Sequence, residues 1–219
     1  MMRPRLRQRL HVKPIRGLSF NKMIPNILTL LALCSGMTAI RFGLEEHYHQ
    51  AVIAILVAGI FDGIDGRIAR LLKGTSEFGA ELDSLSDFVS FGVAPSLLMY
   101  LWSMQSLSSL GWMIALLFTI CCGLRLARFN TQIGADLPPY AYNFFTGVPA
   151  PAAAALAMLP LVAEFELGWS LFRSPYFCII TTVVTAGLMV SRVPTFSGKR
   201  LRIPADYVVK AGAEDKYVL

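Results

Sequence analysis

The feature that most constrains this chain is a series of long apolar segments joined by short polar links. A membrane-spanning helix needs about 20 predominantly apolar residues. The chain has 219 residues, of which only 16% are charged, whereas soluble domains carry roughly 25%. We therefore predict an all-α integral membrane protein with six transmembrane helices in one bundle. The six expected spans are Ile24–Leu44, Gln50–Leu72, Leu85–Met104, Leu110–Phe129, Val148–Phe165 and Pro175–Arg192.

The distribution of basic residues predicts the orientation. Residues 1–23 contain seven Lys and Arg and no acidic residue, and basic residues beside a span favour the cytoplasmic side. We expect a basic cytoplasmic arm (1–23), a membrane domain (24–194) and a cytoplasmic tail (195–219), so both termini are cytoplasmic. The net charge of +6 fits attraction to membrane lipid headgroups. Nucleic acid is not an expected partner, because no nucleic-acid-binding fold is recognisable.

Four aspartates lie in or beside the second and third expected spans. They are Asp62, Asp65, Asp83 and Asp87. Charges at such positions are costly and usually mark a site or a pathway inside the bundle. Helical periodicity places the first two on one arc of a helix, and residues 83 and 87 stack one turn apart on the next. A turn over Leu72–Glu77, containing Gly74 and Ser76, would bring the four carboxylates together near the cytoplasmic boundary.

Converging carboxylates repel one another, and a divalent cation offsets that repulsion. All-oxygen ligation suits Mg²⁺, Mn²⁺ or Ca²⁺ better than zinc. Four aspartates could hold two ions, and two ions can clamp a phosphoryl group. Two other interpretations stay open at this point. Asp62 and Asp65 could form the relay of a cation-coupled transporter, and the neighbouring Gly66 and Gly79 could serve helix packing alone.

The spacing D-x2-D-G-x2-A-R-x8-G-x3-D-x3-D over residues 62–87 resembles the signature of the CDP-alcohol phosphatidyltransferases. The resemblance implies transfer of a phosphatidyl group from a CDP-linked lipid to an alcohol, with release of CMP. It implies Mg²⁺ or Mn²⁺, with two ions, and a homodimer. The implied metal ligands are Asp62, Asp65, Asp83 and Asp87, the last of which is also the general base. The implied CDP-lipid site comprises Gly66, Ala69, Arg70 and Gly79, with Asn26 and Thr29 from the segment IPNILT near the nucleotide.

Three further segments bear on the acceptor alcohol. Gly123–Asn130, Asn143–Ala153 and Met189–Phe196 resemble, in the same order, the members of the family that use L-serine. The implied reaction makes phosphatidylserine from CDP-diacylglycerol in phospholipid biosynthesis. The expected setting is a bacterial inner membrane, with the active site facing the cytoplasm.

The serine carboxylate needs a binding partner, and paired hydrogen bonds from an arginine could supply it. The candidate serine-binding residues are Arg125, Arg128, Asn130 and Asn143. Glycerol 3-phosphate, inositol phosphate and choline remain alternative acceptors.

Overall fold

A computed structural model of the chain describes residues 20–72, 76–132, 144–191 and 194–196. Most of the predicted arm and nearly all of the predicted tail lie outside these ranges. The long helices are α1 (Phe20–Leu44), α2 (Tyr48–Leu71), α3 (Glu77–Asp87), α4 (Ala94–Trp102), α5 (Ser109–Gln132), α6 (Ala150–Leu167) and α7 (Pro175–Val190). Between them lie a π-helical segment η1 (Phe88–Val93) and two 3₁₀ turns, η2 (Met104–Leu107) and η4 (Ser170–Arg173).

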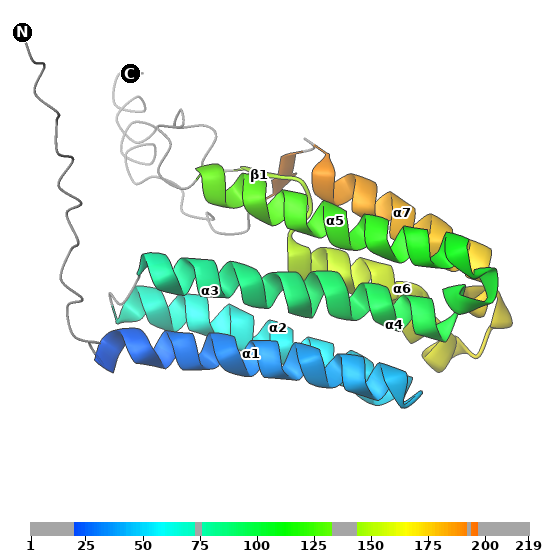
Figure 1. Cartoon of the computed structure of the whole chain (residues 1–219), viewed down its shortest axis with the longest axis horizontal. Coiled ribbons are helices and arrows are strands. Elements are labelled where there is room, and N and C mark those ends of the chain that lie inside the picture. The colour runs from blue at the N-terminus through cyan, green and yellow to red at the C-terminus, as the bar shows by residue number, and fades with distance from the viewer. Residues whose placement is uncertain (1–19, 73–75, 133–143, 192–193, 197–219) are drawn as a thin grey trace, which may run out of the picture.

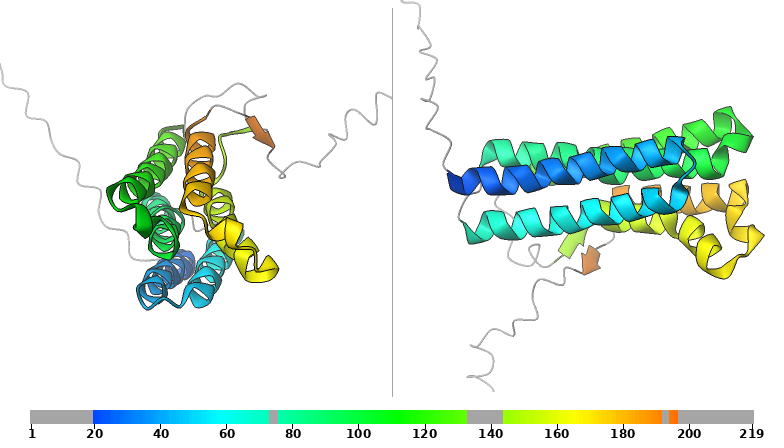
Figure 2. Two further views of the ribbon diagram at one scale, coloured as in Figure 1. Left: turned by 90° about the vertical axis from the view of Figure 1, so that its right-hand side faces the viewer. Right: turned by 90° about the horizontal axis from the view of Figure 1, so that it is seen from below.

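α3, η1 and α4 form one continuous helical stretch; this stretch and the other five long helices lie side by side along the long axis of the molecule, and successive ones alternate in direction (Figures 1 and 2). The start of α1, the end of α2, the start of α3 and the end of α5 lie at one end, which we call the proximal end (Figure 1). The α1–α2 turn, η2 and η4 lie at the other end, the distal end. Segments far apart in sequence therefore meet at the same end of the bundle.

Within the described ranges, four helical stretches are long and apolar enough to cross a membrane, and α7 is a shorter apolar helix. The four are Met23–Leu44, Glu77–Trp102, Ser109–Thr131 and Ala150–Leu167. Large apolar side chains are exposed along the outside of these helices, as expected where lipid rather than water surrounds them. The chain is thus a largely helical membrane protein, while the predicted number of six spans is not established by helix length and composition.

The membrane-crossing stretch that corresponds to the third expected span begins at Glu77, eight residues before the start expected from hydropathy. The reason is a local capping interaction. Ser76 has an extended backbone, and its hydroxyl accepts a hydrogen bond from the Gly79 amide at 3.0 Å. This bond satisfies one of the free amides at the helix start, so the helix begins before the apolar run does.

The π-helical segment η1 follows Asp87 directly and allows this stretch to continue into α4. The Ala94 amide donates to the Val89 carbonyl, five residues back. Pro95 lacks an amide hydrogen, and its ring would clash with the carbonyl four residues before it. The wider turn relieves that clash. Such π turns are frequent at functional sites.

Two short strands differ from the expected all-helical fold. β1 (Phe144–Thr146) pairs antiparallel with β2 (Pro194–Phe196). Correspondingly, α7 ends at Val190, two residues before the end of the expected sixth span, and Ser191 is extended. Backbone groups outside the helices need hydrogen-bond partners, and this pairing provides them. It also brings together two of the three segments that suggested an acceptor.

α1 packs closely against the α3–η1 stretch. The hydroxyl of Ser86 donates to the Thr29 carbonyl at 3.1 Å, and that of Ser90 donates to the Ala32 carbonyl at 3.2 Å. Gly36 lies opposite Ser90, where a Cβ atom would come within 2.8 Å of the Ser90 Cα. Small residues permit this approach between membrane helices.

We predict that Gly36→Ala destabilises the bundle. Alanine gains about 1 kcal/mol over glycine in a helix interior, but overpacking at this contact costs roughly 1–3 kcal/mol. The midpoint of thermal unfolding in detergent should fall. Gly187→Ala on α7 is the matched control, because no atom lies within 4 Å of its added Cβ. A Gly36→Ala protein as stable as the Gly187→Ala protein would contradict the close contact.

Candidate active site

Three of the four aspartates form a cluster at the proximal end. One carboxylate oxygen from each of Asp62, Asp83 and Asp87 lies within 4.8 Å of the others. Asp62 comes from α2, and the other two are one turn apart on α3, so the helical spacing aims both at the α2 carboxylate. All three residues are half-buried. Their negative charges are therefore concentrated where little water can screen them.

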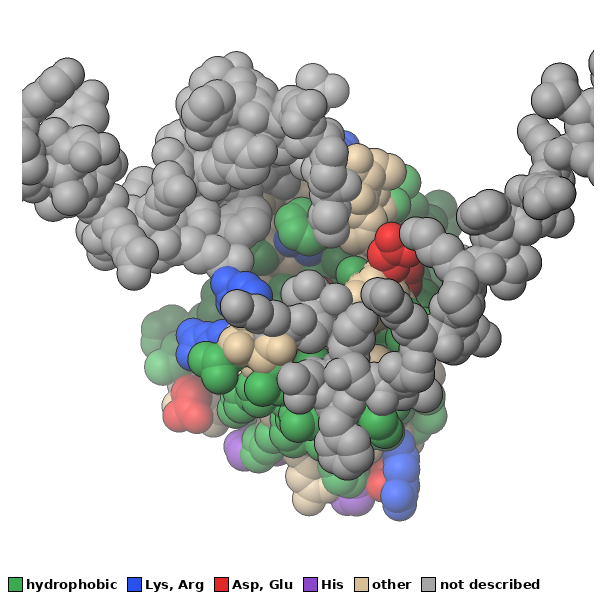
Figure 3. Space-filling model, turned by 90° about the vertical axis from the view of Figure 1, so that its left-hand side faces the viewer, with side chains coloured by type: hydrophobic (Ala, Val, Ile, Leu, Met, Phe, Trp, Pro, Cys, Tyr) green, Lys and Arg blue, Asp and Glu red, His purple; other side chains and the backbone are tan. Residues whose placement is uncertain are grey.

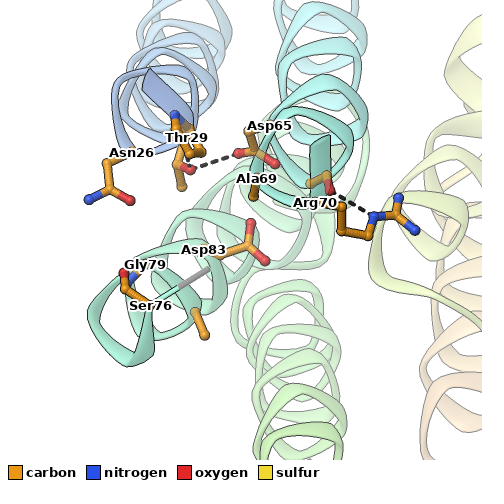
Figure 4. Close-up of a pocket in the computed structure, with 11 residues that line it drawn as sticks. Asn26, Thr29, Asp65, Ala69, Arg70, Ser76, Gly79 and Asp83 are labelled. Carbon is orange, nitrogen blue, oxygen red and sulfur yellow. Dashed lines mark hydrogen bonds between the residues drawn. The ribbon is translucent and has the colours of Figure 1, made fainter. Parts of the chain in front are cut away.

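Asp65 has a different environment from the other three. It is only 4% exposed, and its Oδ2 accepts a hydrogen bond from the Thr29 hydroxyl on α1 at 2.7 Å (Figure 4). The Pro25 carbonyl also lies 3.0 Å from that hydroxyl. Asp65 is thus tied to α1 and is not one of the three residues whose oxygens lie within 4.8 Å of one another, but it interacts electrostatically with Asp62 and Asp83. Its predicted role as a metal ligand stays a prediction.

A cavity of about 200 Å³ opens between α1, α2 and α3 beside the cluster (Figure 4). Every residue predicted for the CDP-lipid site lines it: Asn26, Thr29, Gly66, Ala69, Arg70 and Gly79. Asp65 and Asp83 line it as well. Residue 83 therefore belongs to both the cavity and the aspartate cluster, and the two features adjoin.

Two glycines and an arginine shape the cavity. A Cβ at Gly79 would lie 3.0 Å from both the Asn26 Oδ1 and the Ser76 Oγ, whereas a Cβ at Gly66 would meet only open space. Arg70 is exposed, and its Nε donates to the Gly66 carbonyl at 2.9 Å. This bond uses one donor of the guanidinium and leaves its terminal NH₂ groups for a ligand.

The end of α5 approaches the aspartates from the other side. Arg125 is half-buried and interacts electrostatically with Asp62 and Asp87. Of the other predicted serine-binding residues, Arg128 donates from Nη1 to the Val190 carbonyl at 3.0 Å. Asn130 donates from Nδ2 to the Ser84 hydroxyl at 2.9 Å. These two residues tie α5 to α7 and to α3. Among the candidates that the structure describes, Arg125 is the one that interacts electrostatically with the cluster.

Asn143, the fourth predicted serine-binding residue, lies outside the described residues. Figure 3 views the bundle from the proximal end and shows basic side chains exposed there; Arg67 and Arg70 at the end of α2 are both exposed.

The sequence did not predict that Ser84 and Ser86 would contribute to this end of the bundle. The capping role of Ser76 was missed as well, although its place before an acidic first turn is typical of a helix-capping residue. The partners of Ser84 and Ser86 could not be predicted, because they depend on which helices pack together.

Comparison with known proteins identifies the class. Residues 22–210 match the CDP-alcohol phosphatidyltransferase family, so the chain belongs to that family and the resemblance in its aspartate signature is confirmed.

Its relatives include the CDP-diacylglycerol–serine O-phosphatidyltransferase of Mycobacterium tuberculosis H37Rv, 41% identical over 195 residues that cover 88% of this chain and 67% of that protein. The enzymes of the same name from Helicobacter pylori 26695 and Bacillus subtilis 168 are each 35% identical. These alignments cover 80% and 78% of this chain, and 73% and 88% of the two relatives.

The donor set of the cluster fits a hard divalent cation. Three carboxylate oxygens within 4.8 Å of one another match the oxygen ligands that Mg²⁺ and Mn²⁺ prefer. Asp62, Asp83 and Asp87 would hold such an ion. Once bound, the ion would offset negative charge on neighbouring phosphate oxygens.

We predict that Mn²⁺ raises the midpoint of thermal unfolding of the wild-type protein, because it relieves repulsion within the cluster. Asp62→Asn, Asp83→Asn and Asp87→Asn should each abolish most of this stabilisation. Glu81→Gln removes an acidic group from the exposed side of the same helix α3 and should leave it unchanged. Equal stabilisation of all four variants would place the ion elsewhere.

Proposed function

We propose that this chain transfers the phosphatidyl group of CDP-diacylglycerol to the hydroxyl of L-serine and releases CMP. The observation that carries the proposal is the position of Asp83, which lines the cavity and also belongs to the aspartate cluster. A diphosphate bound in the cavity would therefore lie beside the cluster. The relatives bear the name of this reaction, and the geometry is consistent with it.

The donor half of the site is the cavity. The cytidine and diphosphate would occupy the space between Asn26, Gly66 and Gly79, where the small glycines allow a ligand to approach the backbone. Arg70 would pair with phosphate oxygens through its terminal NH₂ groups. Holding the scissile bond in place is a major part of catalysis for this kind of transfer.

The acceptor half is the space between the cluster and α5. Arg125 would bind the serine carboxylate and orient the hydroxyl toward the phosphorus. Asp87 would accept the hydroxyl proton as the serine oxygen forms its bond to phosphorus. The bond from phosphorus to the CMP oxygen breaks, and CMP leaves with the bonding electrons. Arg70 would offset negative charge on the departing CMP phosphate, and divalent ions held by the aspartates, proposed as two Mg²⁺ or Mn²⁺, would add positive charge there.

An apolar groove of about 230 Å³ supports a lipid donor. It lies between α2, η1 and α6, and is lined by Ile55, Leu56, Gly59, Ile60, Phe91, Pro151, Ala155 and Met158. Ile60 and Phe91 lie within one helical turn of Asp62 and Asp87, respectively. An acyl chain in this groove would remain in the apolar layer while the headgroup reached the aspartates.

The proposal includes the membrane arrangement. α2 and α7 run alongside the four membrane-crossing stretches (Figures 1 and 2), which supports six spans. With the basic arm preceding α1, the proximal end would face the cytoplasm of a bacterial inner membrane, with both termini on that side. The homodimer implied by the family resemblance stays a prediction.

The test of the reaction is CMP release by the purified protein in detergent, with CDP-diacylglycerol and Mn²⁺. Release should require serine and stop on chelation. Asp87→Asn should lower turnover roughly a hundredfold or more, since the proton acceptor is lost. Glycerol 3-phosphate, inositol phosphate and choline should not replace serine. If only one of these other alcohols supports release, the transfer chemistry stands and serine is not the acceptor. If folded protein releases no CMP with serine or any of them, an untested acceptor becomes the first alternative and the transporter interpretation the second.

The two arginines of α5 should behave differently. Arg125→Gln should raise the KM for serine about tenfold, the effect expected from losing a charge-assisted hydrogen bond, with little change in the KM for the CDP-lipid. Arg128→Gln should instead lower the midpoint of thermal unfolding, because it loses the bond to the Val190 carbonyl. Steady-state kinetics and thermal unfolding of both variants measure this difference. The reverse pattern would move the acceptor site toward Arg128.

A further inference from the structure

A second hollow lies at the distal end of the bundle, whereas the aspartates lie at the proximal end. It has a volume of about 690 Å³ and lies where η2 and η4 meet. Its lining residues are Leu101, Trp102, Ser103, Gln105, Ser106, Ser170, Arg173, Ser174 and Pro175. The ends of α4 and α6 and the start of α7 converge there (Figure 1), and nothing in the proposed reaction uses this region.

The floor of this distal hollow is built from buried, hydrogen-bonded residues. Trp102 is 5% exposed and Ser103 is 9% exposed. The Ser103 hydroxyl donates to the Arg173 carbonyl at 2.8 Å, which ties the end of α4 to η4. The Ser106 hydroxyl donates to the Ser103 carbonyl at 3.1 Å. These bonds hold the rim residues in place, so the hollow is part of the fold.

The lining carries one positive charge and no acidic residue. In the described part of the chain, two arginines lie at the distal end, Arg41 and Arg173, and only the first is paired with a carboxylate. The Nε of Arg41 contacts the Glu45 carboxylate at 2.9 Å. Arg173, in contrast, has no carboxylate within 4.0 Å among the described residues. An exposed cation beside the apolar layer, without a counter-ion in the protein, can attract one from its surroundings.

Further hydrogen-bond donors surround this charge. Ser174 precedes α7 but makes no side-chain capping bond. Within the described residues, the side chains of Ser170 and Gln105 also make no hydrogen bond. Hydroxyl, amide and guanidinium groups together offer donors to an oxyanion. The chemistry of the lining therefore selects an anion such as a phosphate group.

The surface beside the hollow indicates where that phosphate comes from. Tyr176, Ile180 and Val184 are spaced four residues apart on α7, and all three are more than half exposed. They form an apolar stripe that begins one residue after Pro175, at the rim. A phosphate in the hollow would thus have apolar surface next to it, along the direction in which a lipid tail extends. A free phosphate ion would make no use of this stripe.

We propose that the distal hollow binds the phosphate group of a phospholipid in the leaflet opposite the active site. Arg173 supplies the charge, Ser170 and Ser174 supply hydroxyl donors, and a tail follows the stripe on α7. The bound lipid bridges η2, η4 and the start of α7, and so stabilises the connection between α6 and α7. This inference does not depend on the proposed reaction.

The experiment titrates the delipidated full-length protein, in neutral detergent, with dioctanoyl phosphatidylglycerol and follows the midpoint of thermal unfolding. The wild-type midpoint should rise. Arg173→Gln should weaken the apparent affinity about tenfold, as expected for a lost charge-assisted bond. Arg41→Gln removes the same charge from the same end and should titrate like the wild type. Equal affinity of wild type and Arg173→Gln would overturn the proposal.

Two further ligands show whether the phosphate group, the lipid tail or both cause the rise in the unfolding midpoint. Dioctanoylglycerol, which lacks the phosphate, should not distinguish the wild type from Arg173→Gln. Inorganic phosphate should stabilise the wild type much less than the lipid does; equal stabilisation would replace the lipid with a soluble anion. Arg173→Lys retains the charge and should bind lipid nearly as the wild type does. If Arg173→Gln does not fold, Arg173→Lys provides the test. A tenfold loss of lipid affinity in Arg173→Lys would refute a site based on charge.

Discussion

The proximal end of this protein depends on one constraint, which is that carboxylates carried by apolar helices must find partners inside the bundle. Asp65 finds the Thr29 hydroxyl on the neighbouring helix. Asp62, Asp83 and Asp87 lie together, with Arg125 providing attraction from α5. Because these partners come from four helices, satisfying the carboxylates also sets how α1, α2, α3 and α5 are placed around them.

The same constraint divides the site into two halves. On one side of Asp83 lies a cavity shaped by glycines, and on the other lies the cluster facing α5. Serine hydroxyls hold the supporting helices at close range, since Ser86 and Ser90 both donate to carbonyls of α1. The π-helical segment after Asp87 lets the chain pass Pro95 without ending the helix. Rigid support of this kind suits a transfer reaction in which positioning contributes much of the rate.

The sequence predicted the main features of the site because its signals are local. Helical periodicity placed Asp83 and Asp87 on one face, and every residue of the signature lies either in the lining of the cavity or in the aspartate cluster. Predictions that depended on packing were less complete. Arg128 and Asn130 were expected to bind an acceptor; that expectation stays a prediction, and the structure adds that they bond to the Val190 carbonyl and the Ser84 hydroxyl. An arginine at a helix end looks the same in sequence whether it faces a substrate or a neighbouring helix.

The sequence by itself determined that the chain is a helical membrane protein with a phosphatidyltransferase signature, because hydropathy and i, i+4 spacing are properties of single segments. Only the tertiary structure gave Asp65 a hydrogen-bond partner on α1, set the β1–β2 pair beside the helices and left Arg173 next to a hollow whose lining has no carboxylate. The physical reason is common to all three. Each depends on the distance between side chains or strands from different elements, and that distance exists only after the helices have packed.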